Sequence, residues 1–227
     1  MIGSDRYYTD KLAARKLKRC YEIAPPRVQQ YLDAEIEHVL ARIKPGDSVL
    51  ELGCGYGRVL EKLAIKAGII VGVDTSRESL LMGKEAFNRR SNVLFLQMNA
   101  LQLAFIDNAF DVTVCVQNGL SALRVNQLDL IRESLRVTRP GGIVMFSSYS
   151  DKFWPDRLEW FQLQSREGLL GEINEQATGN GTIVCKDGFK ATIIRPEDFI
   201  ALATRLGFTP KITEVDESSF FYEIIAE

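Results

Sequence analysis

Short apolar runs and helical stretches alternate through the middle of the chain. The apolar runs predict five strands, at residues 44–52, 69–74, 92–97, 110–116 and 143–148. Helical patterns fall between several of them, at residues 56–68, 76–90 and 127–142, the last of which ends in a Pro-Gly-Gly turn. Apolar strands alternating with helices are typical of a parallel sheet covered on both faces. We therefore expect an α/β, Rossmann-like, doubly wound sheet.

The N-terminal part has a helical pattern only. Residues 9–22 are polar and basic and predict one helix, and Pro25-Pro26 then restarts the chain. A stripe of apolar positions at spacings of three and four follows up to Ile43. His38 lies off this stripe, so we expect it at the surface. Residues 1–43 are interpreted as an N-terminal helical lid.

The C-terminal part breaks the alternation. Residues 151–194 are rich in aromatic residues, Gly and Asn, and carry a hairpin signal at Lys186-Asp187-Gly188. They are interpreted as an α+β, substrate-side insertion after the fifth strand. Residues 195–208 predict a helix, and residues 209–227 an antiparallel pair of strands at the sheet edge. We expect a single domain over residues 1–227.

Composition narrows the classes of function. The chain has 227 residues, 46% of them hydrophobic, and a formal net charge of −2. This balance disfavours a nucleic-acid partner, which needs a concentrated basic face. Four scattered cysteines and one histidine disfavour a zinc site, and no metal is expected. No apolar run approaches the roughly 20 residues of a membrane span, and no signal peptide is recognised. We expect a cytoplasmic protein without a membrane partner; the oligomeric state stays open.

The stretch "VLELGCGYGRVL" is the strongest functional signal. Gly53, Gly55 and Gly57 follow the first predicted strand and open a helix, and the carboxyl ends of such strands form the ligand crevice. A dinucleotide site needs G-x-G-x-x-G, whose last position here is Arg58. An acid, Asp74, ends the second strand. The pattern predicts a ligand at this turn.

Four motifs in order carry a resemblance to a known family. "VLELGCGYGRVLEKLA", "GVDTS", "LQMNALQLAFIDNAFDVTVCV" and "RVTRPGGIVMFS" resemble the class I S-adenosylmethionine-dependent methyltransferases, small-molecule branch (type 11-like), over about residues 44–148. The resemblance implies a seven-stranded sheet whose last strand is antiparallel, with S-adenosyl-L-methionine as cofactor. It implies cofactor-binding residues Glu51, Gly53, Cys54, Gly55, Gly57, Asp74, Thr75, Ser76, Asn99, Ala100, Leu101, Gln117 and Asn118.

The resemblance also implies roles. The glycines let the backbone approach the methionine part, Glu51 helps to hold its amine, and Asp74 accepts both ribose hydroxyls. Asn99 stands where the family often has an Asp that accepts from the adenine amino group. Gln117 and Asn118 face the methyl group. Asp111 resembles an acid that braces the glycine turn, and the Cys54 thiol is expected to pack away from the ligand.

The acceptor is expected to be an unidentified small molecule, held over the cofactor for in-line methyl transfer. Tyr21, Tyr149 and Trp154 are the candidate substrate-binding residues. From the glycine turn onwards the sequence has no histidine, and no catalytic residue is assigned. Two alternatives stay open: a non-catalytic protein that binds S-adenosylmethionine or S-adenosylhomocysteine, and an NAD(P)-dependent oxidoreductase.

Overall fold

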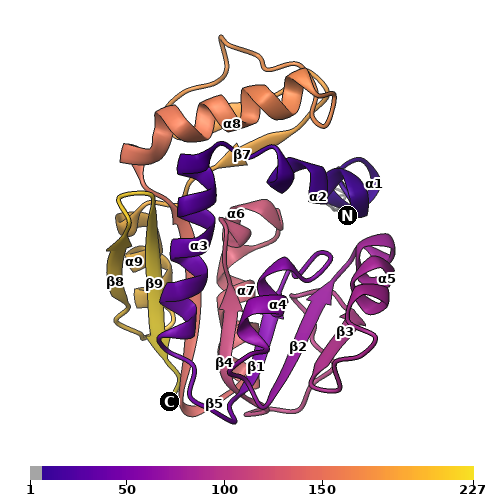
Figure 1. Ribbon diagram of the computed structural model, residues 1–227. Coiled ribbons are helices and arrows are strands. Elements are labelled where there is room, and N and C mark those ends of the chain that lie inside the picture. The colour runs from indigo at the N-terminus through magenta and orange to yellow at the C-terminus, as the bar shows by residue number, and fades with distance from the viewer. Residues whose placement is uncertain (1–6) are drawn as a thin grey trace.

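The computed structural model describes residues 7–227 and has one large sheet of order β3-β2-β1-β4-β5-β9-β8 (Figure 1). Its strands are β1 Ser48–Leu52, β2 Ile69–Asp74, β3 Val93–Gln97, β4 Phe110–Cys115, β5 Thr138–Tyr149, β8 Lys211–Val215 and β9 Ser219–Ile225. Strands β1 to β5 pair in parallel, and β9 is antiparallel to β5 and β8. The expected fold class and the antiparallel last strand are confirmed.

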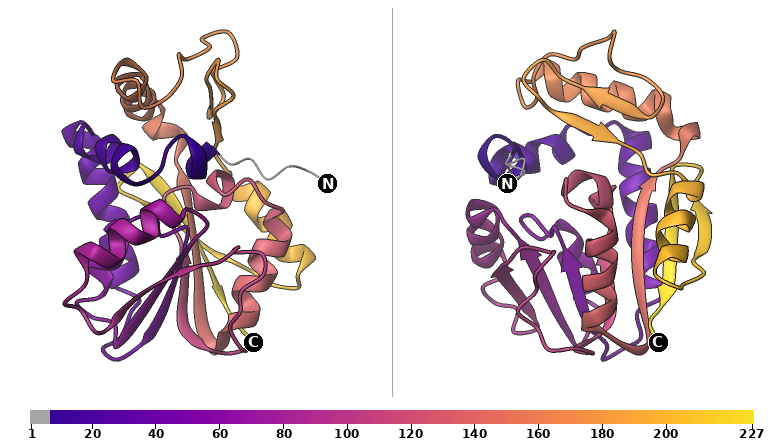
Figure 2. Two further views of the ribbon diagram at one scale, coloured as in Figure 1. Left: turned by 90° about the vertical axis from the view of Figure 1, so that its right-hand side faces the viewer. Right: turned by 180° about the vertical axis from the view of Figure 1, so that it is seen from behind.

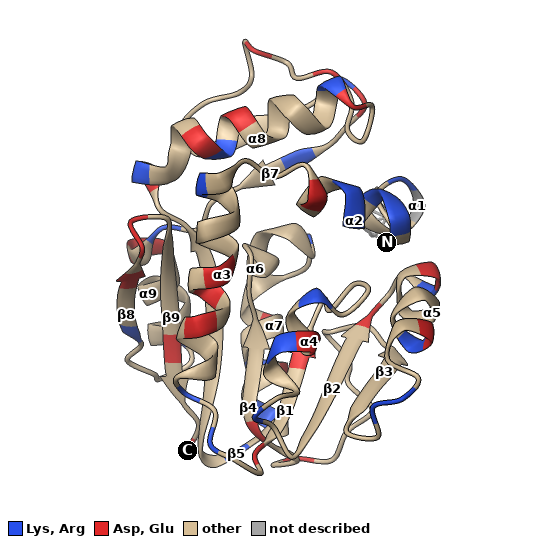
Figure 3. Cartoon of the chain, viewed as in Figure 1, with Lys and Arg blue, Asp and Glu red and all other residues tan. Residues whose placement is uncertain are grey.

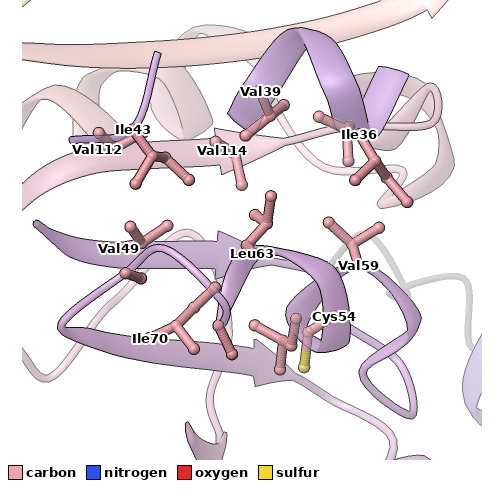
Figure 4. Packing of buried hydrophobic residues seen from close by; sticks show 14 of the residues in the cluster. Ile36, Val39, Ile43, Val49, Cys54, Val59, Leu63, Ile70, Val112 and Val114 are labelled. Carbon is pink, nitrogen blue, oxygen red and sulfur yellow. The ribbon is translucent and has the colours of Figure 1, made fainter. Parts of the chain in front are cut away.

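Helices cover both faces of the sheet (Figure 2). One face packs against α3 Pro26–Leu40, α4 Arg58–Leu63 and α5 Arg77–Ala86, and the other against α6 Gly119–Ala122, α7 Gln127–Val137 and α9 Pro196–Arg205. Neighbouring residues of β1 divide between these cores, because successive strand side chains point to opposite faces. Val49 lies in the first core (Figure 4) and Leu50 in the second.

A third apolar cluster lies beyond the carboxyl ends of the parallel strands (Figure 1). It joins α1 Tyr7–Asp10, α2 Ala14–Glu22 and the start of α3 to η1 Asp151–Phe153, α8 Trp154–Arg166 and a hairpin of β6 Thr182–Val184 and β7 Lys190–Thr192. The Trp160 Nε1 donates to Cys20 O at 2.8 Å, and the Tyr7 hydroxyl to Asp187 Oδ2 at 2.7 Å. The division into lid and insertion stays a prediction, and residues 1–6 of that lid lie outside the described residues.

Two local expectations were wrong about element boundaries. The predicted helix over residues 9–22 is two helices, because Ala14 has φ +48° and its N–H donates to Ser79 Oγ on α5 at 2.8 Å. Helix α7 ends at Val137, and the expected Pro-Gly-Gly turn belongs to strand β5. Pro140 disfavours helical backbone at the residue before it, and Thr138 already pairs with Phe110 of β4.

His38 is not at the surface, so that expectation was wrong as well. Its side chain is 10% exposed, and its Nε2 lies 2.8 Å from Glu223 Oε1. Its ring stacks on Phe221, with centroids 4.2 Å apart. Both partners belong to β9, against which this part of α3 packs. Within residues 7–227, no helix has the length and apolar character needed to span a membrane.

Candidate functional site

The glycine turn between β1 and α4 needs glycine for its backbone. Gly53, Gly55 and Gly57 have φ values of +75°, +54° and +92°, in the left-handed region that side chains disfavour. At Gly57 a Cβ would also lie 2.5 Å from Cζ of Phe95. Gly53 N–H donates to Val73 O at 2.8 Å, which ties the turn to the end of β2.

A cavity of about 180 Å³ lies above this turn. Its floor includes many predicted cofactor residues, namely Glu51, Gly53, Cys54, Gly55, Asp74, Thr75, Ser76 and Gln117. Its roof comes from the N-terminal helices, β5 and the segment after it, and includes Tyr8, Leu12, Cys20, Tyr21, Tyr149, Trp160, Phe161 and Phe189. Two predicted substrate residues, Tyr21 and Tyr149, are therefore at the cavity. Figure 4 shows the Cys54 sulfur beside core side chains, although its residue also lines the cavity.

Asp74 holds the turn in place with both carboxylate oxygens. Oδ2 accepts from Gly55 N at 2.8 Å, and Oδ1 from Ser76 N at 2.7 Å. Each oxygen keeps a lone pair for a further donor. Burial raises the pKa of Asp74, and the bonds from Ser76 and Gly55 oppose that rise. Ser76 in turn caps α5, because its Oγ accepts from Ser79 N at 3.3 Å.

Buried polar atoms of an acid, a base and an amide lack protein partners at the cavity wall. Among the described residues, none hydrogen-bonds to Oε2 of Glu51, to Nε or Nη2 of Arg58, or to Nε2 of Gln117, and all four atoms are buried. Burial raises the pKa of Glu51 to about 8, and Arg58 opposes that rise. The Arg58 guanidinium lies 4.7 Å from the Tyr21 ring centroid. Buried polar atoms without partners are costly. They therefore suit a ligand that carries both charges.

Sequence reasoning missed Arg58 and Glu35. Arg58 counted only as a departure from the dinucleotide pattern, although its fixed place after the third glycine was a usable signal. Glu35 lies within the apolar stripe of α3 and is fully buried. Its Oε2 accepts from Gln117 N at 3.0 Å, and burial raises its pKa to about 7. This bond helps hold Gln117 and Asn118, which both have left-handed backbone, with φ +56° and +60°.

Several predicted site residues lie away from the cavity lining, namely Gly57, Asn99, Ala100, Leu101, Asn118 and Trp154. The Asn118 side chain donates to Thr192 O at 3.0 Å and accepts from Ser148 Oγ at 2.8 Å. It therefore ties β7 to β5. Asn99 is exposed, and its Oδ1 accepts from Leu101 N at 3.0 Å. Trp154 is half-buried beside Arg157, and Trp160 lines the cavity instead.

The expected role of Asp111 at the glycine turn was wrong. Its Oδ2 accepts from Ser48 N at 2.7 Å and from Ser48 Oγ at 2.6 Å, and Oδ1 accepts from Arg139. Strands β1 and β4 are parallel, so a residue near the start of β4 faces the start of β1. Asp111 therefore lies at the opposite end of β1 from the glycines. Residues 7–227 hold no group of three or more His, Cys, Asp or Glu suited to a metal ion.

The sheet order, the antiparallel last strand and the glycine turn below a cavity define the fold of the class I methyltransferases. Residues 49–142 match a family model described as a methyltransferase domain. The malonyl-[acyl-carrier protein] O-methyltransferase of Marinomonas sp. (strain MWYL1) is 31% identical over 166 residues, which are 67% of this chain and 59% of that protein. The chain spans about half the length of most curated relatives it matches.

Solved structures agree on the fold. The PH0226 protein from Pyrococcus horikoshii OT3 is 20% identical with a TM-score of 0.68, covering 99% of this chain and 100% of that one. The N-methyltransferase NodS from Bradyrhizobium japonicum WM9, in complex with S-adenosyl-L-homocysteine, is 17% identical with a TM-score of 0.59, covering 94% and 93%. The methyltransferase-domain match, the curated relative and the shared fold support a class I S-adenosylmethionine-dependent methyltransferase with S-adenosylmethionine as cofactor.

Proposed function

We propose that this chain transfers the methyl group of S-adenosylmethionine to a small molecule, with the cofactor in the cavity above the glycine turn. The observation that carries the proposal is an acidic and a basic side chain with buried atoms that lack protein partners, Glu51 Oε2 and Nε and Nη2 of Arg58. The methionine part of the cofactor has an ammonium and a carboxylate, which match these two groups. NAD has no such pair, so this observation disfavours the oxidoreductase alternative.

Different residues would then bind different parts of the cofactor. Glu51 would accept from the ammonium group, Arg58 and the Gln117 amide would donate to the carboxylate, and Asp74 would accept from the ribose hydroxyls. Thr75 and Ser76 line the same wall and would contact the adenosine. Asn99, Ala100 and Leu101 lie beyond the lining of this cavity. Their proposed contact with the adenine therefore requires the ligand to extend past it.

Methyl transfer depends more on the position of the acceptor relative to the methyl group than on a dedicated base. When bound, the cofactor supplies an electrophilic methyl group on a positively charged sulfur. The chain's own part is to hold the acceptor in line and to exclude water, and orientation alone supplies roughly 7–11 kcal/mol of a barrier. The aromatic roof from residues 1–43 and 151–194, acting as lid and substrate-side insertion, would enclose the acceptor there. A cytoplasmic location is part of the same proposal.

A set of thermal melts tests the cofactor site. S-Adenosylhomocysteine at about 100 times its dissociation constant should add roughly 2.7 kcal/mol of stability, a shift of several degrees. 5′-Methylthioadenosine, which lacks the amino-acid part, should shift wild type less. Arg58→Met should remove most of that difference, and Asp74→Ala should weaken both ligands. Lys62→Met, at an exposed position on the same helix, is the matched control. An equal response to both ligands, or a shift with NAD alone, would contradict the proposal.

Catalysis needs its own measurement. Purified protein, S-adenosylmethionine and fractionated small-molecule extract should yield S-adenosylhomocysteine, and one fraction should gain a methyl mass. Binding of S-adenosylhomocysteine without turnover in any fraction would favour the non-catalytic binding protein instead.

A further inference from the structure

The roof of the cavity is a wall of aromatic rings. Tyr21 packs against Trp160, Trp160 against Phe161, and Phe161 against Phe189, with ring centroids 5.7–6.0 Å apart. Two polar groups in this wall are already used: the Tyr21 hydroxyl donates to Gln117 Oε1 at 2.9 Å, and Trp160 Nε1 donates to Cys20 O. The wall therefore offers mostly ring faces and edges, which suit a planar molecule.

A fully buried cation stands directly behind this wall. The Arg157 guanidinium on α8 lies 4.3 Å from the Tyr149 ring centroid and 5.5 Å from that of Phe161. It donates to two backbone carbonyl oxygens, Gly181 O at 2.8 Å and Ala191 O at 3.0 Å. Its Nε has no partner, and none of the acids within residues 7–227 forms an ion pair with it. A buried charge without a counter-charge is costly, so an anion nearby would be stabilised.

The acids of the cavity lie at its other end. Among the described lining residues, the acids are Glu51 and Asp74, both beside the glycine turn. Glu35 lies behind Gln117 and is used to accept from its backbone N–H. Asp187 is paired with Tyr7 and Lys11 outside the lining. The lining of the roof end therefore contains no acid, and the Arg157 cation lies behind it.

The protein surface next to the cavity also carries positive charge. Figure 3 shows Lys and Arg concentrated on α2 and on the turn before it, and the exposed ones include Lys11, Arg15, Lys16, Lys18 and Arg19. Other residues of the same segment, such as Leu12, Cys20 and Tyr21, line the cavity. Glu22 is the acid of α2, and it pairs with Lys18. A basic rim raises the local concentration of anionic small molecules.

We propose that the methyl acceptor is a planar molecule with an acidic group, a phenol, enol or carboxylic acid, bound as its anion against Tyr149 and Phe161 with Arg157 as counter-charge. This inference rests on the proposed function. The anion already has the electron pair that forms the bond to the methyl carbon, and the carbon–sulfur pair stays on sulfur. No proton has to be removed in that step, so no general base is required. An ammonium acceptor lacks a free electron pair, and Arg157 opposes its charge.

Binding of two near-isosteric probes tests this. Equilibrium dialysis would compare 4-nitrophenol, at a pH where it is ionised, with neutral 4-nitroaniline, on protein saturated with S-adenosylhomocysteine. We expect 4-nitrophenolate to bind wild type about tenfold or more tightly, the scale of one charge acting at short range. Arg157→Gln should bring the ratio close to one, and Arg157→Lys should keep most of it. Arg166→Met, an exposed position on the same helix, should change nothing.

The outcomes separate the two proposals. If S-adenosylhomocysteine does not bind, the proposed function fails. If it binds but 4-nitroaniline or benzylamine binds as tightly as 4-nitrophenolate, or 4-nitrophenolate shows no saturable binding, the acceptor class is wrong. If Arg157→Gln does not fold, the wild-type ratio and the Arg157→Lys ratio still decide, because a ratio near one in either overturns the inference.

Discussion

Binding of S-adenosylhomocysteine should release nearly one proton from Glu51 at pH 7. This side chain is 4% exposed, and burial raises its pKa to about 8. A carboxyl group with that pKa carries about 0.9 proton at pH 7. An ammonium group at its unpartnered Oε2 stabilises the carboxylate and lowers the pKa. The proton therefore leaves when the ligand binds.

The required coupling is of ordinary size. Most of the proton is released if the bound pKa falls to about 6, a change worth roughly 2.7 kcal/mol. Two unit charges 4 Å apart interact by about 4 kcal/mol at an effective dielectric constant of 20. A direct contact between Glu51 and the ammonium group therefore suffices, even with part of the energy spent on desolvation.

Titration calorimetry in buffers of different ionisation enthalpy counts the protons. Wild type should release about 0.8 proton at pH 7, because about 0.9 is bound in the free protein and about 0.1 in the complex. Glu51→Gln should bind more weakly and lose that release, and 5′-methylthioadenosine should release almost none from wild type. The reasoning is refuted if wild type releases no proton at pH 7. It is equally refuted if Glu51→Gln releases as many as wild type, because Glu35 or the ligand would then be the source.

Three further changes have expected outcomes. Gly57→Ala should destabilise by roughly 1–3 kcal/mol in urea melts, because φ is +92° and the new Cβ meets Phe95; Gly46→Ala, also at φ +92° but with open space, should cost less. The ligand-free protein should lose stability as pH rises from about 4.5 towards 8, because the raised pKa of Glu51 keeps a proton that the unfolded chain releases, and Glu51→Gln should flatten this slope. Asp111→Asn should lower the free energy of unfolding by about 1 kcal/mol above pH 4. The bonds from Ser48 and Arg139 outweigh desolvation and lower the pKa of Asp111 to about 2, so the carboxylate is ionised there. The affinity for S-adenosylhomocysteine should not change.

Local patterns were enough to predict the sheet and the glycine turn. The strands are apolar and short, and the φ values of Gly53 and Gly55 are a property of the residue type as much as of the fold. Asp74 was found because it ends a strand next to that turn. Such features depend on a few neighbouring residues, so the sequence contains them directly.

The same local patterns could not predict which side chains reach the cavity, because that depends on how the elements pack. Trp154 and Trp160 are six residues apart on α8, which puts their directions about 120° apart around the helix. Either could line the cavity until the face of α8 that meets α2 is known. Asn118 follows Gln117 directly, yet its amide is used between β5 and β7. Arg157 looks like any helical arginine until the hairpin that buries it is in place.

The contacts that hold the roof over the cavity differ between the N-terminal helices and the layer of α8 and the hairpin. Helix α8 follows β5 with only η1 between them, and Arg157 bonds it to both edges of the hairpin inside a buried layer. The N-terminal helices meet this layer through apolar contacts, a partly buried bond from Tyr7 to Asp187 and one buried bond from Trp160, as well as through exposed pairs such as Arg19 with Glu167, which contribute little to stability. Separation there leaves both bonds of the buried Arg157 intact, whereas lifting α8 off the hairpin breaks them. We therefore expect ligand to reach the cavity by movement of α1 and α2, so that the basic residues of α2 meet the acceptor first.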